Sequence, residues 1–305
     1  MRYGFTRRFP GFSGFIEISP HDFEQAKQSK QNMLVTLGIE EKIDLVLENY
    51  AELERDLLDL ALRYSLFPRH DWPSLMGDLQ LVNRRLANLL TTGKLYVDQV
   101  QHDVGRLFGS NSGEEKKVRE WISREREENF GYRVLDEIRN HVQHRSFPIH
   151  GLSYPGSWEP RDSPKHLRFG ILPWIQPSNI RGDPKFKPSV LDELEAQGEK
   201  LNLVPFVREY VAAIGRIHEE LRKLVDPVVI QCKQTLEHIY ARASEVFGDQ
   251  LAGLSLVRED ADGQEAEFIA VFGEPIKRID ALRTKNQNLA SLAARYVSGK
   301  AQDPK

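Results

Sequence analysis

Cysteine is almost absent from the sequence, which contains a single one, Cys232, among 305 residues. One thiol excludes an intramolecular disulfide framework and any cysteine-rich metal site. Long apolar runs are also missing, because the longest are far shorter than the roughly 20 residues that span a bilayer. The start of the chain, MRYGFTRRF, lacks the apolar stretch of a secretion signal. We therefore expect a cytoplasmic protein without a membrane-spanning segment.

A strong charge of either sign is missing as well. The 42 basic and 45 acidic residues give a net charge of −3, and 40% of the residues are hydrophobic, as in ordinary globular proteins. This balance argues against coating of nucleic acid by bulk charge, so any site for a polyanion must be local. The sequence also has no glycine-rich phosphate loop, no HExxH helix and no nucleophile elbow.

Apolar residues recur at helical spacing along most of the chain, which predicts a mainly α fold built as an up-down bundle of long helices. Two runs joined by a DADG turn, Leu254–Glu259 and Ala266–Phe272, predict a small C-terminal β-hairpin. The helices that flank Pro227 form either a pair or one kinked helix. Helices are expected over residues 21–36, 40–66, 74–108, 114–144, 189–198, 205–225, 227–247 and 275–297.

Residues 146–187 differ in composition and predict a proline-rich, partly β insertion. Eight of the chain's 16 prolines lie within residues 145–188, which excludes a long helix there. The one strand-like run is LRFGILPWI, residues 167–175. Residues 145–187 carry seven basic and three acidic side chains, with aromatic residues between them. The insertion either holds single-stranded RNA by charge and base stacking or uses its tryptophans to anchor a long loop on the bundle.

The expected organisation has three parts. Residues 1–40 form an N-terminal arm, with a short strand or extended segment, and a peripheral helix. Residues 41–250 form the helical bundle, with the insertion at 146–187. Residues 251–305 form the β-hairpin and a C-terminal helix packed on the bundle. A chain of 305 residues can bury a sizeable core without disulfides.

The stretch Tyr132–Gly151, YRVLDEIRNHVQHRSFPIHG, gathers polar groups on one face of a predicted helix. At about 100° per residue, a carboxylate, an amide, a guanidinium and an imidazole lie opposite an apolar stripe. The stripe consists of Leu135, Ile138 and Val142, and the polar group consists of Asp136, Arg139, Asn140 and His144. This arrangement is typical of a site.

Arg139, Asn140 and His144 resemble the signature of the HEPN superfamily, an arginine, usually followed by a polar residue, and a histidine four to six positions later. The surrounding run is also similar to a group of bacterial HEPN-like proteins. In that group an earlier helix carries a pattern like NRRLANLLTTGKLYVD, residues 83–98 here. The resemblance covers about residues 75–151.

This resemblance implies a HEPN-like helical bundle and metal-independent cleavage of RNA through attack by the 2′-hydroxyl. It also implies a homodimer with a composite cleft between protomers. The expected role is that of a toxin or phage-defence effector, with an antitoxin or another regulatory partner. The alternative is a catalytically inactive HEPN-like module that binds RNA or a protein.

The side-chain chemistry of the motif agrees with RNA cleavage. The permanently charged guanidinium of Arg139 binds a phosphate and stabilises charge on a phosphorane-like transition state. The imidazole of His144 exchanges protons at neutral pH, and Asn140 orients the imidazole or the substrate. The structural alternative is that Arg139 pairs with Asp136 or Glu137 on its own helix, while His144 caps the last turn.

Neighbouring residues are expected to support the site or bind substrate: Asp136, Tyr96, Arg145, Lys165 and Arg168. Tyr96 either reaches the motif or is half-buried in the bundle, and Asp98 is expected in solvent. Neither a metal nor a cofactor is expected, because His141, His144 and His150 have no cysteine partner and no carboxylate at clear ligand spacing. His141 is expected at the surface.

Overall fold

The computed structural model is mainly helical and describes residues 1–8, 14–67, 71–159, 166–248, 251–271 and 273–295. The described residues form two compact units, each assembled from separate stretches of the chain. Unit 1 contains residues 1–41, 100–116 and 220–287, and unit 2 contains residues 42–99, 117–219 and 288–305. Four helices contribute residues to both units: α1 (Pro20–Leu66), α2 (Trp72–Phe108), α3 (Gly113–Glu128) and α6 (Val204–Phe247).

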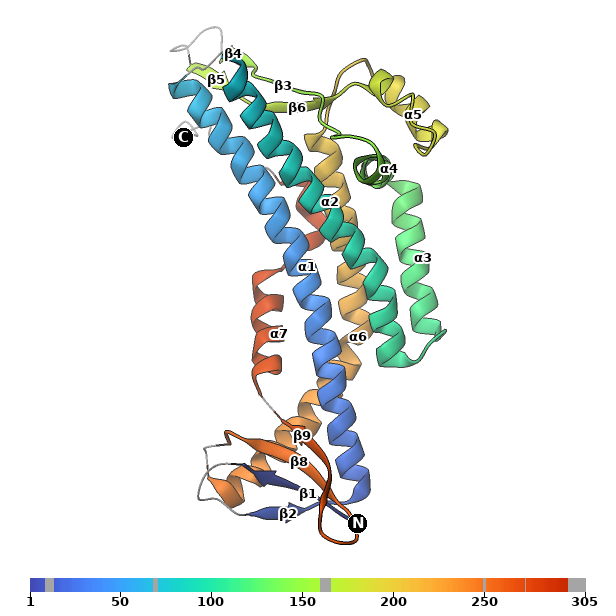
Figure 1. The fold of residues 1–305 in the computed structure, drawn as a ribbon, viewed down its shortest axis with the longest axis vertical. Helices are drawn as coiled ribbons and strands as arrows, with labels where there is room; N and C mark the ends of the chain where they lie inside the picture. The colour runs from blue at the N-terminus through green and yellow to red at the C-terminus, as the bar shows by residue number, and fades with distance from the viewer. Residues whose placement is uncertain (9–13, 68–70, 160–165, 249–250, 272, 296–305) are drawn as a thin grey trace. The chain divides into compact units, whose positions relative to one another are not determined.

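Unit 1 contains a four-stranded antiparallel sheet in the order β2-β1-β8-β9 (Figure 1). The predicted C-terminal hairpin is confirmed as β8 (Leu254–Glu259) and β9 (Glu265–Ala270). The N-terminal segment supplies β1 (Arg2–Arg7) and β2 (Phe15–Glu17), and β1 pairs with β8 from Arg2 opposite Glu259 to Arg7 opposite Leu254. The first residues therefore complete the sheet of the C-terminal hairpin.

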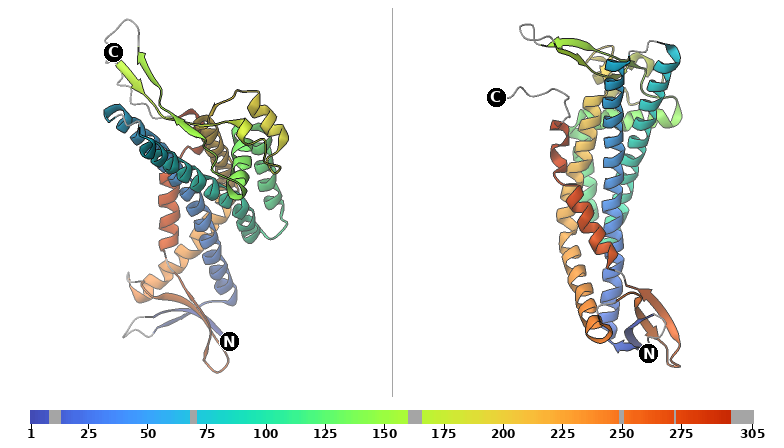
Figure 2. Two further views of the ribbon diagram at one scale, coloured as in Figure 1. Left: turned by 45° about the horizontal axis from the view of Figure 1, so that its top comes forward. Right: turned by 90° about the vertical axis from the view of Figure 1, so that its left-hand side faces the viewer.

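A buried carboxylate joins three helical segments of unit 1. Glu40 is 1% exposed and accepts hydrogen bonds from Arg222 Nε at 3.1 Å and Arg283 Nε at 2.8 Å. Arg283 lies on α7 (Glu274–Lys285) and also donates to Asp226 at 2.7 Å. Figure 2 shows α7 alongside the second part of α6, where these ion pairs fix it.

Two predicted helix boundaries were wrong. The helices expected over residues 21–36 and 40–66 are one helix, α1, because Val35 and Ile39 are both buried and carry the apolar stripe past Gly38. The helix expected over residues 275–297 ends at Lys285, and a short 3₁₀ turn over Leu289–Ala294 follows it. The open choice at Pro227 is decided in favour of one helix, since α6 continues through it.

The third long helix, expected to run from 114 to the motif, is interrupted at Asn129. Its backbone is extended there (φ −109°, ψ 112°), and its side-chain amide donates to Glu125 Oε2 at 2.7 Å. The motif therefore lies on a separate helix, α4 (Phe130–His144). A Cβ on Gly131 would lie 2.7 Å from Glu209 Cβ, so glycine permits close packing of α4 on α6. Figure 1 shows α4 end-on next to α3.

The insertion in unit 2 is partly β, as predicted. A three-stranded antiparallel sheet contains β3 (Gly151–Ser153), β6 (Leu172–Ile175) and β7 (Leu201–Asn202). A separate ribbon pairs β4 (Gly156–Glu159) with β5 (His166–Phe169). The single strand expected over residues 167–175 is thus two strands, because Gly170 turns away and donates its N–H to Pro155 O at 3.1 Å.

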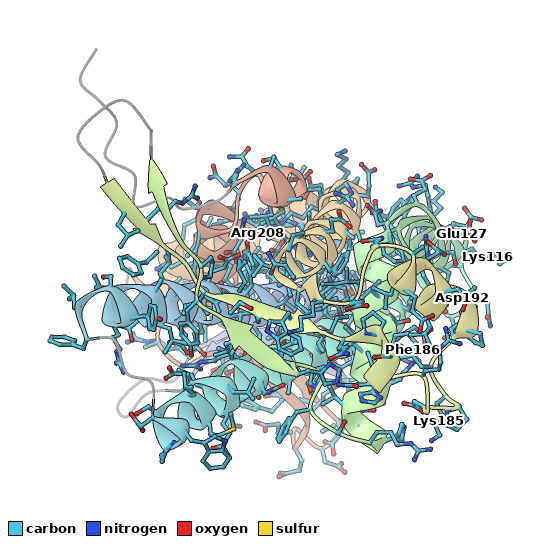
Figure 3. All side chains as sticks on the ribbon, turned by 90° about the horizontal axis from the view of Figure 1, so that it is seen from above. Lys116, Glu127, Lys185, Phe186, Asp192 and Arg208 are labelled. Atoms are coloured by element: carbon cyan, nitrogen blue, oxygen red, sulfur yellow. The ribbon has the colours of Figure 1, made fainter. Side chains whose placement is uncertain are left out.

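Between β6 and β7 the chain forms a 3₁₀ turn, η1 (Pro177–Asn179), and a helix, α5 (Pro188–Glu195). Figure 3 labels Lys185 and Phe186 on the loop beside α4, and Asp192 on α5. Phe186 is 3% exposed and anchors this loop in the core of unit 2. In the part of the chain that the structure describes, no helix carries an apolar stretch long enough to cross a bilayer.

Candidate functional site at the end of helix α4

Helix α4 is buried over most of its circumference, which leaves its C-terminal end as the accessible part. Leu135 and Ile138 are fully buried, as the predicted stripe requires, whereas Val142 is only partly covered. His141 takes the next core position at 5% exposure, so the prediction that it lies at the surface was wrong. Helix α6 covers one side of α4, and the loop before α5 covers another.

Arg139 and Asn140 are brought together in the structure. Both side chains are partly buried, and Arg139 Nη1 donates a hydrogen bond of 3.1 Å to Asn140 Oδ1. Arg139 Nε is buried and has no hydrogen-bond partner among the described residues. The guanidinium is therefore bound by a neutral amide and not by a carboxylate.

The carboxylates of α4 are bound by a different arginine. Asp136 Oδ2 lies 3.0 Å from Arg126 Nη2, and Glu137 Oε1 lies 3.6 Å from the same nitrogen. Glu137 also accepts the Lys187 N–H at 3.3 Å. Burial raises the pKa of Glu137, and the neighbouring charge of Asp136 adds to this, while the Lys187 N–H and Arg126 oppose it. Asp136 thus joins α3 to α4, and the structural alternative, in which Arg139 pairs with Asp136 or Glu137, is not formed among the described residues.

His144 and Arg145 lie at the exposed end of α4. His144 is the last residue of the helix, and it forms no hydrogen bond or ion pair with the residues that the structure describes. Arg145 is exposed, and its Nε lies 3.7 Å from Asp183 Oδ1. The predicted imidazole is therefore accessible to a ligand, with a guanidinium next to it in the chain.

The other predicted supporting residues lie elsewhere. Tyr96 is fully buried, and its hydroxyl lies 2.9 Å from His218 Nδ1 between α2 and α6, so it is a core residue of unit 2. Asp98 is exposed and pairs with Lys94 at 2.7 Å. Arg168 is exposed on β5, and Lys165 lies outside the described residues.

A chain of three side chains at the end of α4 was missed by sequence reasoning. His141 Nδ1 lies 2.8 Å from Asp183 Oδ2, and His141 Nε2 lies 3.1 Å from Ser146 Oγ. Asp183 Oδ1 accepts the Lys185 N–H at 3.0 Å. Burial by itself raises the pKa of Asp183, but the Lys185 N–H, His141 and Arg145 together hold that pKa below its ordinary value of 3.8. Asp183 is therefore a carboxylate at neutral pH.

The burial of His141, one member of this hydrogen-bonded group, could have been predicted from the sequence. His141 follows Ile138 by three residues, so it fits the apolar stripe as well as Val142 does. A buried histidine requires a polar partner, which would have prompted a search for a carboxylate. Asp183 lies 42 residues later in a proline-rich segment, and no periodicity connects the two.

The loop after α4 is held by its backbone. Asn83 Oδ1 accepts the Ile149 N–H at 3.1 Å, and Asn83 Nδ2 donates to Ile149 O at 3.3 Å. His150 Nδ1 accepts the Gln176 N–H at 2.9 Å, and burial, followed by the nearby His141, lowers the pKa of His150. Asn83, on α2, thus positions the segment that carries Ser146.

The described residues contain no group of three or more His, Cys, Asp or Glu side chains placed to hold a metal ion. The polar groups at the end of α4 are instead two imidazoles, a serine hydroxyl, a buried carboxylate and two guanidiniums. Proton transfer and anion binding are the chemistry that these groups support. Comparisons with protein-family models, with curated proteins and with solved structures return no match for the chain.

Proposed function

We propose that the exposed end of α4 binds RNA and cleaves it without a metal ion, as a HEPN-type endoribonuclease. The observation that carries this proposal is that Arg139 is bound by the amide of Asn140, while Arg126 binds both carboxylates of the helix. An arginine without a carboxylate partner keeps its charge for an anionic ligand. A purely structural role for Arg139 would be expected to use the acidic residues beside it.

The proposed reaction transfers protons and neutralises charge at one phosphodiester. The 2′-hydroxyl attacks the adjacent phosphorus, and the P–O bond to the 5′ oxygen of the next nucleotide breaks. His144 exchanges a proton with the attacking or the leaving oxygen, since it is the accessible imidazole of the motif. Arg139 stabilises the charge on the phosphorane, and Asn140 fixes the guanidinium. The products end in a 2′,3′-cyclic phosphate and a 5′-hydroxyl.

A homodimer completes this site. Arg139 and His144 are five residues apart, about 140° around a helix axis, so they lie at opposite edges of the polar face of α4. A two-fold axis near the ends of two α4 helices brings a second copy of each side chain into the site. Two imidazoles then serve the two proton transfers that the reaction requires.

Exposed residues around the end of α4 suit contact with RNA. Phe147 is 62% exposed and follows the motif directly, where a base can stack on its ring. Arg145 is exposed next to His144 and provides positive charge for the phosphate backbone. Single-stranded RNA is the proposed substrate, because stacking on an aromatic ring requires an unpaired base.

The test compares cleavage of a labelled single-stranded RNA by the wild type, Arg139→Ala and His144→Ala, with His102→Ala as a control at another exposed histidine. We expect both motif variants to lose at least about 100-fold in rate at unchanged helical content, and the control to match the wild type. Equal cleavage by all four proteins would refute the proposal. RNA binding without cleavage by the wild type would instead support the inactive binding module.

A further inference from the structure

Ser146, His141 and Asp183 form a hydrogen-bonded chain with a defined direction. The Asp183 carboxylate can only accept, so His141 Nδ1 must carry the proton in the 2.8 Å bond between them. A neutral imidazole then has its lone pair on Nε2. The 3.1 Å bond to Ser146 is therefore one in which the Oγ–H donates to Nε2. This is the relation of a serine to a general base that a third group orients.

The exposure of the three side chains suits a serine nucleophile with a buried general base. Asp183 and His141 are 7% and 5% exposed, so the carboxylate and the base are shielded from water. Ser146 is exposed, so its hydroxyl is open to a ligand. Backbone hydrogen bonds position Asp183 and the loop that carries Ser146, since Asp183 accepts the Lys185 N–H and Asn83 accepts the Ile149 N–H. The three groups are thus positioned before any ligand arrives.

We propose that Ser146 is a nucleophile activated by His141 and Asp183, and that this site hydrolyses carboxylic esters. In the first step Ser146 Oγ bonds to the carbonyl carbon while its proton moves to His141 Nε2. The bond to the leaving alcohol breaks as His141 returns that proton to the alcohol oxygen. In the second step a water oxygen bonds to the acyl carbon while its proton moves to His141 Nε2. The bond from that carbon to Ser146 Oγ then breaks, His141 returns the proton to Ser146 Oγ, and the carboxylic acid is released. Asp183 stabilises the imidazolium in both steps.

Donors for the carbonyl oxygen are available beside the nucleophile. The backbone N–H groups of Ser146 and Phe147 donate to no acceptor among the described residues. In serine hydrolases the oxyanion accepts from the N–H of the nucleophile in one class and from the N–H of the residue after it in another. Arg145 adds positive charge next to the serine in sequence.

The ester chemistry and the proposed RNA chemistry use different catalytic side chains, and Arg145 and Phe147 lie beside both. His144 is absent from the serine chain, and Ser146 is absent from the proposed RNA chemistry. The neighbouring imidazole His150 accepts the Gln176 N–H and takes no part in either. Variants at His144 and Ser146 therefore separate the two activities.

The test is covalent labelling of the full-length protein by a fluorophosphonate, followed by peptide mass spectrometry. We expect Ser146 to be modified in the wild type, in His144→Ala and in Ser153→Ala, the control at an exposed serine of β3. Ser146→Ala should not be labelled, and its exposed position means that folding is retained. His141→Gln, or Asp183→Asn where the histidine variant does not fold, should label at least about 100-fold more slowly.

Turnover is measured on 4-nitrophenyl acetate with the same proteins. The wild type and Ser153→Ala should release nitrophenol at equal rates, and Ser146→Ala at the rate of the uncatalysed reaction. Labelling of the wild type no faster than of Ser146→Ala, or modification at another residue, would overturn the proposal. So would ester hydrolysis that Ser146→Ala leaves unchanged.

Discussion

Replacing Asp183 by asparagine should destabilise unit 2, because an amide cannot make the contacts of this carboxylate. Asp183 is 7% exposed, binds His141 Nδ1 at 2.8 Å and the Lys185 N–H at 3.0 Å, and lies 3.7 Å from Arg145. Asparagine has one acceptor oxygen, so its NH₂ group must face one of these donors. With its NH₂ group toward His141, the asparagine forces the imidazole into the other tautomer, and with its NH₂ group toward Lys185 it leaves that N–H unpaired. Either arrangement loses a hydrogen bond to a charged group and removes the partner of Arg145.

The size of the effect follows from these contacts. Loss of a hydrogen bond to a charged group costs about 1.5–3 kcal/mol. The half-exposed Arg145 adds less than about 1 kcal/mol, since water screens its charge. A loss of about 2–3 kcal/mol is expected at neutral pH. This is a large share of the roughly 5–15 kcal/mol by which domains are stable.

The pH dependence of this loss has a definite sign. The pKa of Asp183 in the folded protein lies below its ordinary value of 3.8. A lowered folded pKa gives stability that is present above the unfolded pKa and is lost as the pH falls through the folded pKa. Asparagine does not titrate. The contribution of the Asp183 charge to the difference between wild type and Asp183→Asn should therefore shrink as the pH falls below 3.8.

Urea unfolding followed by circular dichroism measures the loss. The matched control is Asp192→Asn on α5, where the carboxylate is 71% exposed and lies 3.9 Å from Arg181. The control should differ from the wild type by less than about 0.5 kcal/mol. If Asp183→Asn is as stable as the control, the account of the buried chain at the end of α4 is wrong.

Three further predictions concern the core and the assembly. Tyr96→Phe should cost about 1–2 kcal/mol in urea unfolding, because it removes a fully buried hydrogen bond to His218 Nδ1, and an unchanged midpoint would contradict this. Gly93→Ala should lower the free energy of unfolding by about 1–3 kcal/mol, because its Cβ would meet the Tyr210 hydroxyl and ring. Gly77→Ala in the same helix meets nothing within 4 Å, so it should raise the free energy of unfolding by up to about 1 kcal/mol. Equal effects of the two alanines would contradict that packing. Light scattering at micromolar concentration should give the mass of two chains, and a fully active monomer would rule out the composite site.

Elements with a strong hydrophobic periodicity and a local turn signal could be predicted from the sequence. The helix expected over residues 74–108 is α2, which begins at Trp72, and Asp71 Oδ1 accepts the Ser74 N–H at 3.0 Å. The hairpin of β8 and β9 follows from its alternating strands and the turn between them. Local chemistry determines both, so a single sequence suffices for them.

Features that depend on distant partners were not predictable. The break at Asn129 depends on Gly131 packing against Glu209, 78 residues later. The pairing of β1 with β8 joins strands at opposite ends of the chain. The position of Tyr96 in the core depends on His218, 122 residues away. Periodicity records how polar a position is, but it carries no information on which remote residue will meet it.

Only part of the candidate site was predicted, because some of its side chains have partners that are distant in sequence. Arg139, Asn140 and His144 are close in sequence, and the bond between the first two follows from their adjacency. Whether Arg139 would pair with a carboxylate could not be known, because Arg126 competes for both. His141 was misplaced because its partner, Asp183, comes from the loop before α5.

The chemistry of the RNA ends tests the central claim most directly. Purified protein is incubated with a single-stranded RNA in the presence of EDTA, and the termini of the fragments are identified by mass spectrometry. The wild type should give 2′,3′-cyclic phosphate and 5′-hydroxyl ends, and His144→Ala should give none, since proton transfer by an imidazole needs no metal. Intact RNA with the wild type, or the same fragments from His144→Ala, would contradict the assignment of this activity to the end of α4.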